Sequence, residues 1–212
     1  MKIGVLGSGI VAQTLAAGFV KHGYETMVGT RDRSKLAEWN RANPKARLGS
    51  FSETAAFGDV VVLAVKGLAS AEALRAAGDN VSGKVVIDAT NPIADAPPEN
   101  GLLKLASSLD GSLMERLQTE FPRIRFVKAF SSVGYFHFVD PQFGGVKPTM
   151  FICGNDGAAK TTVTEILDRF GWEAADMGTV EAARAIEPLC VLWCIPGLLR
   201  NEWNHAFKLL KK

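Results

Sequence analysis

The chain has 212 residues, 47% of them hydrophobic, which is enough for one large domain with a full hydrophobic core. A formal net charge of +2 at pH 7 favours no nucleic-acid or other polyanion surface, and three cysteines without a CxxC pair do not predict a disulfide framework. No apolar run approaches the roughly 20 residues of a membrane helix. We therefore expect a soluble, cytoplasmic protein with small-molecule partners, no membrane and no nucleic acid.

The first predicted element is a buried strand over residues 1–6, because this short apolar run contains two β-branched residues. A glycine turn follows, and residues 11–20 then keep the apolar spacing of a helix. A strand, a G-x-G-x-x-A turn and a helix in this order are typical of a site for a dinucleotide pyrophosphate. The alternative is a turn that only packs the helix on the sheet. The predicted phosphate-binding residues are Gly7, Ser8, Gly9, Ile10 and Val11.

The residues after the second predicted strand, residues 24–29, indicate the type of cofactor. NAD-binding folds place an Asp or Glu near this strand end to hold the ribose hydroxyls, but here Thr30 and Arg31 stand there. A carboxylate would repel a 2′-phosphate, whereas a hydroxyl beside Arg31 and Lys35 would bind it. The alternative is a solvated charge run that opens the next helix, with Asp32 as its cap or as a ribose ligand. We predict NADP(H) in preference to NAD.

Three further elements lead to the next expected cofactor contact. A helix is expected over residues 34–43, and Ser50 and Glu53 have the spacing of a capping box for a second, shorter helix. Residues 60–65 are apolar on both faces and predict an interior parallel strand. This strand ends at the sheet edge where ligands bind, so we expect dinucleotide contacts from Ala64, Val65 and Lys66. A solvated lysine is the alternative for Lys66.

A loop after the strand at residues 84–88 is expected to approach the nicotinamide. It contains Asn91, Pro92 and Ile93, and Asn91 or its neighbour Thr90 could bind the carboxamide or ribose. The alternative is a proline turn with a self-bonded asparagine. Residues 95–101 predict a mobile loop, residues 102–120 weak helix, and residues 125–130 another strand. His137 follows among aromatic residues, which favours a packing role over that of an acid.

The last third of the chain predicts a β-α-β unit and then helix. Strands are expected at residues 150–153 and 172–176, with a helix to residue 170 between them. Residues 180–212 predict helix, broken at Pro196 before a final helix over residues 198–210. Residues 185–195 are apolar nearly all round, so they should pack on the sheet, cover the cleft or meet a second subunit of a homodimer. Cys190 and Cys194 predict buried small hydrophobes, and no metal site is expected.

The whole pattern predicts an α/β fold: a doubly wound, mostly parallel Rossmann sheet over residues 1–179 with a C-terminal helical segment over residues 180–212. The chain also resembles, almost end to end, the NADP oxidoreductase family typified by the NADPH-dependent reductase of coenzyme F420, a 5-deazaflavin. The resemblance rests on the ordered segments GSGIVAQTLA, VGTRDRSKL, VVVLAVKG, VIDATNP, VKAFSSVG, PTMFICGND and EAARAIEPLCVLW.

This resemblance implies a 2′-phosphate held by Thr30, Arg31 and Lys35, nicotinamide near residues 91–93, and an acceptor docked above it. The corresponding loop of archaeal members carries a histidine and a proline, where this chain has two serines. Small residues there leave room for a flat ring. The implied acceptor-binding residues are Phe130, Ser131, Ser132, Val133 and Gly134.

We therefore expect an NADPH-dependent oxidoreductase that moves hydride directly between NADP(H) and a flavin or deazaflavin such as coenzyme F420, without a catalytic side chain. One alternative is an imine or carbonyl reductase similar to pyrroline-5-carboxylate reductase. Such an enzyme would need a proton donor from Ser131, Tyr135 or His137. Another alternative, of a different class, is a sensor that binds NADPH without turnover.

Overall fold

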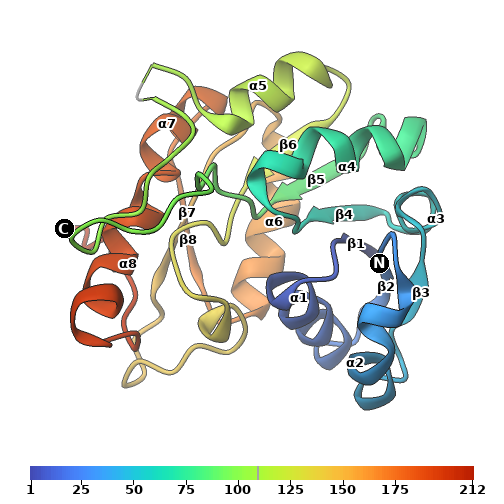
Figure 1. Cartoon of the computed structure of the whole chain (residues 1–212), viewed down its shortest axis with the longest axis horizontal. Helices are drawn as coiled ribbons and strands as arrows, with labels where there is room; N and C mark the ends of the chain where they lie inside the picture. Colours follow the sequence, from blue (N-terminus) through green and yellow to red (C-terminus); the bar gives the residue numbers. More distant parts are fainter. Residues whose placement is uncertain (109) are drawn as a thin grey trace.

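The computed structural model describes residues 1–108 and 110–212, and its centre is a six-stranded sheet (Figure 1). The strand order is β3-β2-β1-β4-β5-β6, and every neighbouring pair is parallel. This order confirms the predicted doubly wound Rossmann sheet. The strands are β1 Lys2–Leu6, β2 Glu25–Gly29, β3 Arg47–Gly49, β4 Val60–Leu63, β5 Val85–Asp88 and β6 Arg125–Lys128.

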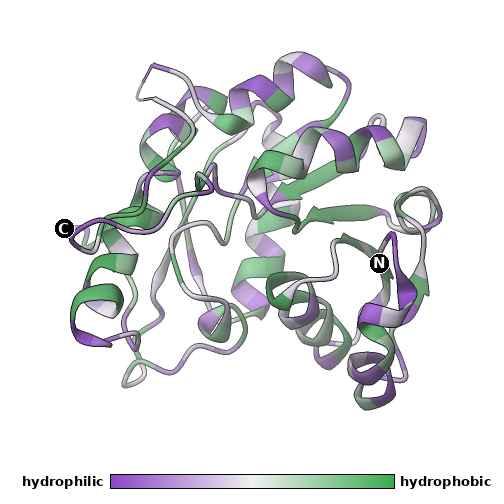
Figure 2. Ribbon diagram, viewed as in Figure 1, coloured by the Kyte–Doolittle hydropathy of each residue, from purple (hydrophilic) through white to green (hydrophobic). Residues whose placement is uncertain are grey.

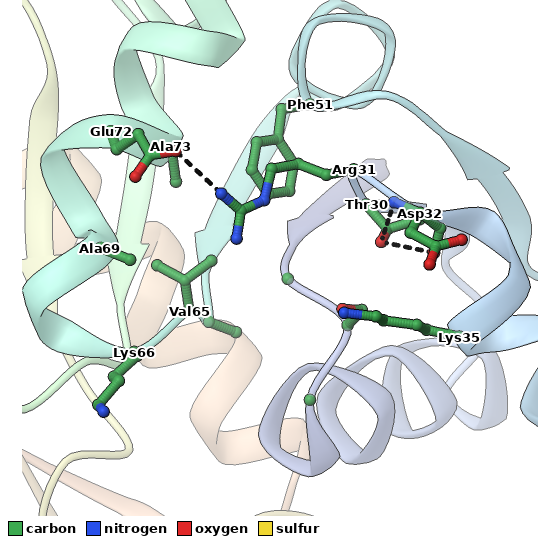
Figure 3. A pocket seen from close by; sticks show the side chains of 14 residues that line it. Thr30, Arg31, Asp32, Lys35, Phe51, Val65, Lys66, Ala69, Glu72 and Ala73 are labelled. Atoms are coloured by element: carbon green, nitrogen blue, oxygen red, sulfur yellow. Dashed lines mark hydrogen bonds and ion pairs between the residues drawn. The ribbon is translucent and has the colours of Figure 1, made fainter.

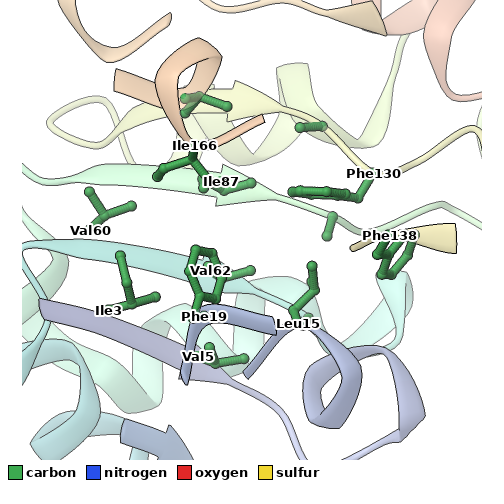
Figure 4. Close-up of a cluster of buried hydrophobic side chains, with 14 of the residues drawn as sticks. Ile3, Val5, Leu15, Phe19, Val60, Val62, Ile87, Phe130, Phe138 and Ile166 are labelled. Carbon is green, nitrogen blue, oxygen red and sulfur yellow. The ribbon is translucent and has the colours of Figure 1, made fainter. Parts of the chain in front are cut away.

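Both faces of the sheet are covered, which explains why the interior strands are apolar without alternation. Alternate strand residues contribute to two separate cores, with Val62 in one and Val61 in the other. Figure 4 shows the first core, where Phe19 and Ile166 pack against the strands. Figure 2 shows the interior strands β4 and β5 in green and the outer helices in alternating purple and green. The covering helices are α1 Ile10–Lys21, α2 Ala37–Ala42, α3 Phe51–Phe57, α4 Ser70–Ala77, α5 Leu113–Glu120 and α6 Gly157–Arg169.

Short 3-10 turns complete the connections between these elements. The turns are η1 Arg33–Leu36, η2 Gly67–Ala69, η3 Gly78–Val81, η4 Tyr135–His137 and η5 Val180–Ala182. The helix expected within residues 102–120 is limited to α5, which starts at a capping box of Ser112 and Glu115. Before it, Ile93 and Leu105 form an antiparallel bridge, so the preceding loop folds back on itself.

The predicted β-α-β unit after residue 149 is present but forms a sheet of its own. Strands β7 Thr149–Ile152 and β8 Glu173–Asp176 pair in parallel across α6. An antiparallel bridge between Lys128 and Cys153 joins this small sheet to β6. The additional pair therefore extends the molecule beyond β6 without lengthening the central sheet.

The C-terminal segment differs from the prediction after residue 200. Helices α7 Ala183–Ile186 and α8 Leu189–Arg200 are present, but α8 continues through Pro196 and ends at Asn201, whose φ is 57°. Residues 201–212 are not helical, so the helix predicted over residues 198–210 is wrong. The chain turns back because Gly197 lacks a Cβ and the Trp203 ring lies against it. The tail then reaches β7, where Phe207 accepts a backbone hydrogen bond from Thr149 (2.8 Å).

Helix α8 is buried on one side and exposed on the other. Trp193 is only 5% exposed and is covered by its own chain, whereas Leu192 and Leu199 are more than half exposed. Val180–Arg200 form a helical run of 21 residues with mean hydropathy 1.5, long and apolar enough by length and composition to cross a membrane. A buried helix of a soluble protein meets the same criteria, and here a third of the most apolar window is buried. The homodimer and the domain boundary at residue 180 stay predictions.

Gly4 in β1 should be required by packing. A Cβ there would overlap the carbonyl oxygen of Thr54 on α3, and this oxygen belongs to a helix held by its capping box. We expect Gly4→Ala to lower the free energy of unfolding by about 1–3 kcal/mol, the usual cost of overpacking, in urea titrations. Gly157→Ala is the matched control, because a Cβ there has no neighbour within 4 Å, and it should change stability by less than about 1 kcal/mol. Equal effects of the two changes would contradict this account.

Candidate dinucleotide site

A cavity of about 220 Å³ lies at the carboxyl edge of the sheet, where β1 and β4 diverge into helices on opposite faces. This is the switch point at which doubly wound sheets bind ligands. Nine of the predicted cofactor residues line it, together with Asp32, which was considered as a ribose ligand, and four residues that the sequence did not indicate (Figure 3). The lining residues are Gly7, Ser8, Gly9, Thr30, Arg31, Asp32, Lys35, Phe51, Ala64, Val65, Lys66, Ala69, Glu72 and Ala73.

The two glycines of the first turn are required for different reasons. Gly7 has φ +139° and a Cβ there would overlap the carbonyl oxygen of Ala64, so the fold itself needs glycine. Gly9 has an ordinary φ of −77°, and a Cβ there would meet nothing within 4 Å. Since no protein atom occupies the space beside Gly9, glycine there is suited to a ligand that approaches the backbone.

The N-terminus of α1 is left open toward the cavity. No side chain caps it and its first turn holds no acidic residue, whereas Ser50, Ser112 and Asp156 cap α3, α5 and α6. The uncapped N–H groups and the positive end of the helix dipole therefore remain available to an anion. The residues of this turn fit a pyrophosphate. Ile10 and Val11 belong to the helix start but do not line the cavity.

The strand end at Thr30 is shaped by hydrogen bonds within the turn. The buried Thr30 hydroxyl donates to the Asp32 carbonyl (3.0 Å) and accepts from the Asp32 N–H (3.1 Å). The Asp32 carboxylate accepts from the Ser34 hydroxyl (2.6 Å) and N–H (2.9 Å), which lowers the pKa of Asp32. Asp32 is therefore a helix cap, one of the two alternative roles considered for it.

Cations at the cavity differ in how they are paired. Arg31 donates to Glu72 (2.9 Å) across the cavity, and Lys66 pairs with Asp95 and points away from Arg31 (Figure 3). Among the described residues, Lys35 makes no ion pair. The ammonium group of Lys35 could therefore bind a phosphate directly, whereas Arg31 would have to break its ion pair with Glu72 to bind a phosphate. Glu72 was missed because it lies on α4, 41 residues from Arg31 in the sequence.

The predicted nicotinamide residues meet at the carboxyl ends of β5 and β6. The Asn91 side-chain N–H donates to the Ser131 carbonyl (2.8 Å). The side-chain oxygens of the same two residues, Asn91 Oδ1 and Ser131 Oγ, are buried and have no hydrogen-bond partner. Unpaired buried atoms are costly in a folded protein, so these two oxygens are candidates for binding a ligand. Pro92 and Ile93 continue this loop.

The predicted acceptor residues are less open than expected. Phe130, Ser131 and Ser132 are each at most 2% exposed, and only Val133 and Gly134 are half-buried. Phe130 has φ +62°, a conformation that bulky residues rarely adopt, which turns the chain sharply after β6. Room for a flat ring here would therefore require movement of the loop, and these residues stay predictions.

Two other candidate groups take the packing roles that were expected. His137 lies between the rings of Phe136 (4.6 Å between centroids) and Phe143 (4.9 Å), and burial lowers the pKa of His137. Cys190 is 5% exposed, and its pKa is raised by its neighbour Cys194 and by burial, whereas Cys194 is only half-buried, so the prediction of a buried cysteine holds for Cys190 alone. Within residues 1–108 and 110–212, no group of three or more metal-ligating side chains was found.

Comparisons with known proteins show the family of this chain and agree with its fold. Residues 2–92 match the family described as NADP oxidoreductase, coenzyme F420-dependent. The F420-dependent NADP reductase of Methanothermobacter marburgensis is 30% identical over 216 residues, covering 95% of this chain and 96% of that protein. A crystal structure of a putative F420-dependent NADP reductase from Arthrobacter sp. FB24 superposes with a TM-score of 0.92 at 33% identity over both whole chains. Rat metalloreductase STEAP3 is 30% identical over 203 residues, covering 93% of this chain but only 39% of that protein.

Gly9→Val should separate binding from folding. The side chain would project where the pyrophosphate is expected, yet it meets no protein atom within 4 Å at its Cβ. We expect a melting temperature near that of the wild type and loss of NADPH binding in calorimetric titrations. Unchanged NADPH affinity in this folded variant would mean that the dinucleotide binds elsewhere.

Arg31→Asp tests whether Arg31 binds the 2′-phosphate of NADP(H). Loss of a charged hydrogen bond should weaken NADPH by about 1.5–3 kcal/mol and NADH far less. Glu72→Gln is the matched control, since it frees the guanidinium and should leave NADPH binding as tight or up to about fivefold tighter. Fluorescence titrations that show equal losses of NADPH and NADH with Arg31→Asp would refute the assignment.

Proposed function

Because this chain belongs to the family of coenzyme F420-dependent NADP oxidoreductases, we propose that it transfers hydride between NADP(H) and a flavin- or deazaflavin-like ring. The family makes it an NADP oxidoreductase; the identity of the acceptor is the proposal. NADPH, when bound, supplies the hydride. The chain's own residues bind the two halves of the cofactor, orient its nicotinamide and exclude water.

The observation that carries the proposal is the pair of unpartnered atoms at the nicotinamide end, Asn91 Oδ1 and Ser131 Oγ. A primary carboxamide has one acceptor oxygen and an NH₂ donor group. Asn91 Oδ1 can accept from the NH₂ group, and the Ser131 hydroxyl can donate to the oxygen. The hydrogen bond from Asn91 to the Ser131 carbonyl keeps the two side chains together. This donor–acceptor pair supports nicotinamide at the edge of β5 and β6.

At the other end, the unpaired cation Lys35 and the exposed Arg31 support a 2′-phosphate beside Thr30. The space beneath Arg31 is bounded by Val65, Ala69 and Ala73 (Figure 3). Small apolar side chains under a planar guanidinium suit an adenine ring. The uncapped start of α1 lies between the two ends and supports the pyrophosphate.

The acceptor is inferred from the acid–base groups near the nicotinamide end. In the described part of the chain, the two serines of this loop have no side-chain partner that would make either a strong acid. His137 packs between aromatic rings, and burial lowers its pKa, which disfavours the protonated form that a proton donor needs. Hydride transfer to a stacked ring needs orientation more than a side-chain acid. These features support a flavin or deazaflavin over a carbonyl or imine.

The proposed function is tested by measuring NADPH oxidation with a panel of candidate hydride acceptors. We expect steady NADPH oxidation, followed by absorbance, with coenzyme F420 or free flavin mononucleotide, and at least tenfold slower oxidation with small aldehydes, ketones or cyclic imines. Brisk turnover of a cyclic imine that is abolished by Tyr135→Phe or His137→Ala would instead indicate an imine reductase. NADPH binding without oxidation by any acceptor would indicate a sensor. Ferric chelates should be added to this panel, because STEAP3, of which this chain covers 39%, is named a metalloreductase.

A further inference from the structure

Three charged side chains are completely buried beneath the nicotinamide end, and the sequence analysis did not identify them. Lys128 ends β6, Asp88 ends β5, and Glu187 lies between α7 and α8. Each side chain is at most 1% exposed. Asp88 and Lys128 are register partners on adjacent parallel strands, so the fold holds them side by side. Buried ions are costly unless they are paired, which makes the contacts of this cluster informative.

The ammonium of Lys128 has a partner for each of its three N–H groups. Its Nζ lies 2.8 Å from Asp88 Oδ2 and 3.0 Å from Glu187 Oε1, and it donates to the Thr90 carbonyl at 2.9 Å. Burial by itself lowers the pKa of Lys128, but the two carboxylates outweigh it and raise that pKa. Lys128 is therefore a fixed cation whose third bond is to the backbone of the nicotinamide loop.

The two carboxylates are themselves held in place by backbone groups. Asp88 Oδ1 accepts from the Thr90 N–H (2.9 Å) and hydroxyl (2.6 Å). Glu187 accepts from the N–H groups of Leu113 (2.9 Å) and Met114 (3.0 Å) at the start of α5. All three polar groups of Thr90 are thus bound by the cluster, directly before Asn91 in the chain.

We propose that Lys128, Asp88 and Glu187 are positioning residues for hydride transfer, which fix Thr90 so that Asn91 and Ser131 present their side chains to the nicotinamide. Lys128 also lies three residues before Ser131, so the cluster supports both loops at once. Through Glu187, the C-terminal helical segment becomes part of this support. The inference rests on the proposed function, but its first measurement needs neither cofactor nor acceptor.

The test uses the isosteric, charge-free triple variant Lys128→Met/Asp88→Asn/Glu187→Gln. Replacing all three avoids leaving an unpaired buried charge, so the fold is expected to persist. The Thr90 carbonyl then loses its donor. We expect amide hydrogen exchange of Thr90 and Asn91 in the cofactor-free protein to accelerate at least tenfold, with residues 10–21 unchanged. Binding of 2′,5′-ADP should stay within twofold, while the hydride-transfer rate at saturating NADPH falls at least tenfold.

Lys84→Met is the matched control. Lys84 stands at the opposite end of β5 and likewise donates to backbone carbonyls, of Ala55 (2.6 Å) and Gly58 (2.7 Å). Its loss should lower stability without changing exchange at Thr90 or the transfer rate. If the triple variant does not fold, Glu187→Gln alone should accelerate exchange at Thr90 about threefold, since Lys128 keeps its other two partners.

Wild-type exchange at Thr90 and Asn91 in the folded triple variant, or in Glu187→Gln where the triple does not fold, would overturn the proposal. An accelerated exchange with an unchanged transfer rate would also overturn it, because the cluster would then be only structural. A wild-type protein that transfers no hydride to any acceptor would refute the proposed function alone. In that event, two measurements still decide whether the cluster positions the nicotinamide end. One is amide hydrogen exchange at Thr90 and Asn91, and the other compares the affinity for NADPH with the affinity for 2′,5′-ADP.

Discussion

The site depends on one constraint: the strands of the central sheet are parallel and in register, so the loops that follow them all begin at the same edge of the sheet. Leu6 pairs with Gly29 and Leu63, Leu63 with Asp88, and Asp88 with Lys128. Each pair fixes where the next loop begins. Glycines then bring these loops into backbone contact, since a Cβ at Gly7 would overlap Ala64 and one at Gly67 would overlap Asn91. The segments that follow these five strands therefore lie along one continuous edge of the sheet.

The two ends of that edge are built from opposite chemistry. At the proposed adenosine end, the charges are exposed, as in the pair of Arg31 and Glu72, whose side chains are 73% and 66% exposed. Solvent screens such a pair, so an incoming phosphate can replace the carboxylate at low cost. At the proposed nicotinamide end, the charges of Lys128 and Asp88 are buried and paired with each other, and the unpaired oxygens of Asn91 and Ser131 belong to neutral groups. The first arrangement suits recognition, whereas the second suits precise orientation.

Most of the fold could be predicted because local patterns carry it. The glycine turn, the capping box at Ser50 and the apolar run of β4 each determine structure within a few residues. What failed depends on distant partners. Strand β3 has only three residues and forms because β2 offers an edge. Trp203, which packs on Gly197, and the backbone pairing of residue 207 with β7 explain why the tail is not helical. Likewise, no local signal pairs Glu72 with Arg31 across 41 residues.

The buried cluster was missed for a related reason, although one signal was present. Lys128 ends β6 and lies between the buried residues Val127 and Ala129, in a stretch that is otherwise apolar from residue 126 to residue 130. A cation there must have buried anionic partners, and Asp88 at the end of the neighbouring strand is the natural first one. The second, Glu187, comes from outside the sheet and could be found only from the fold. An apolar residue at position 128 would leave Asp88 and Glu187 as unpaired buried carboxylates. It also could not bind the Thr90 carbonyl, whose neighbouring N–H and hydroxyl Asp88 already holds. The buried charge therefore has two roles: it neutralises two carboxylates in the core, and it fixes the backbone of the loop above them.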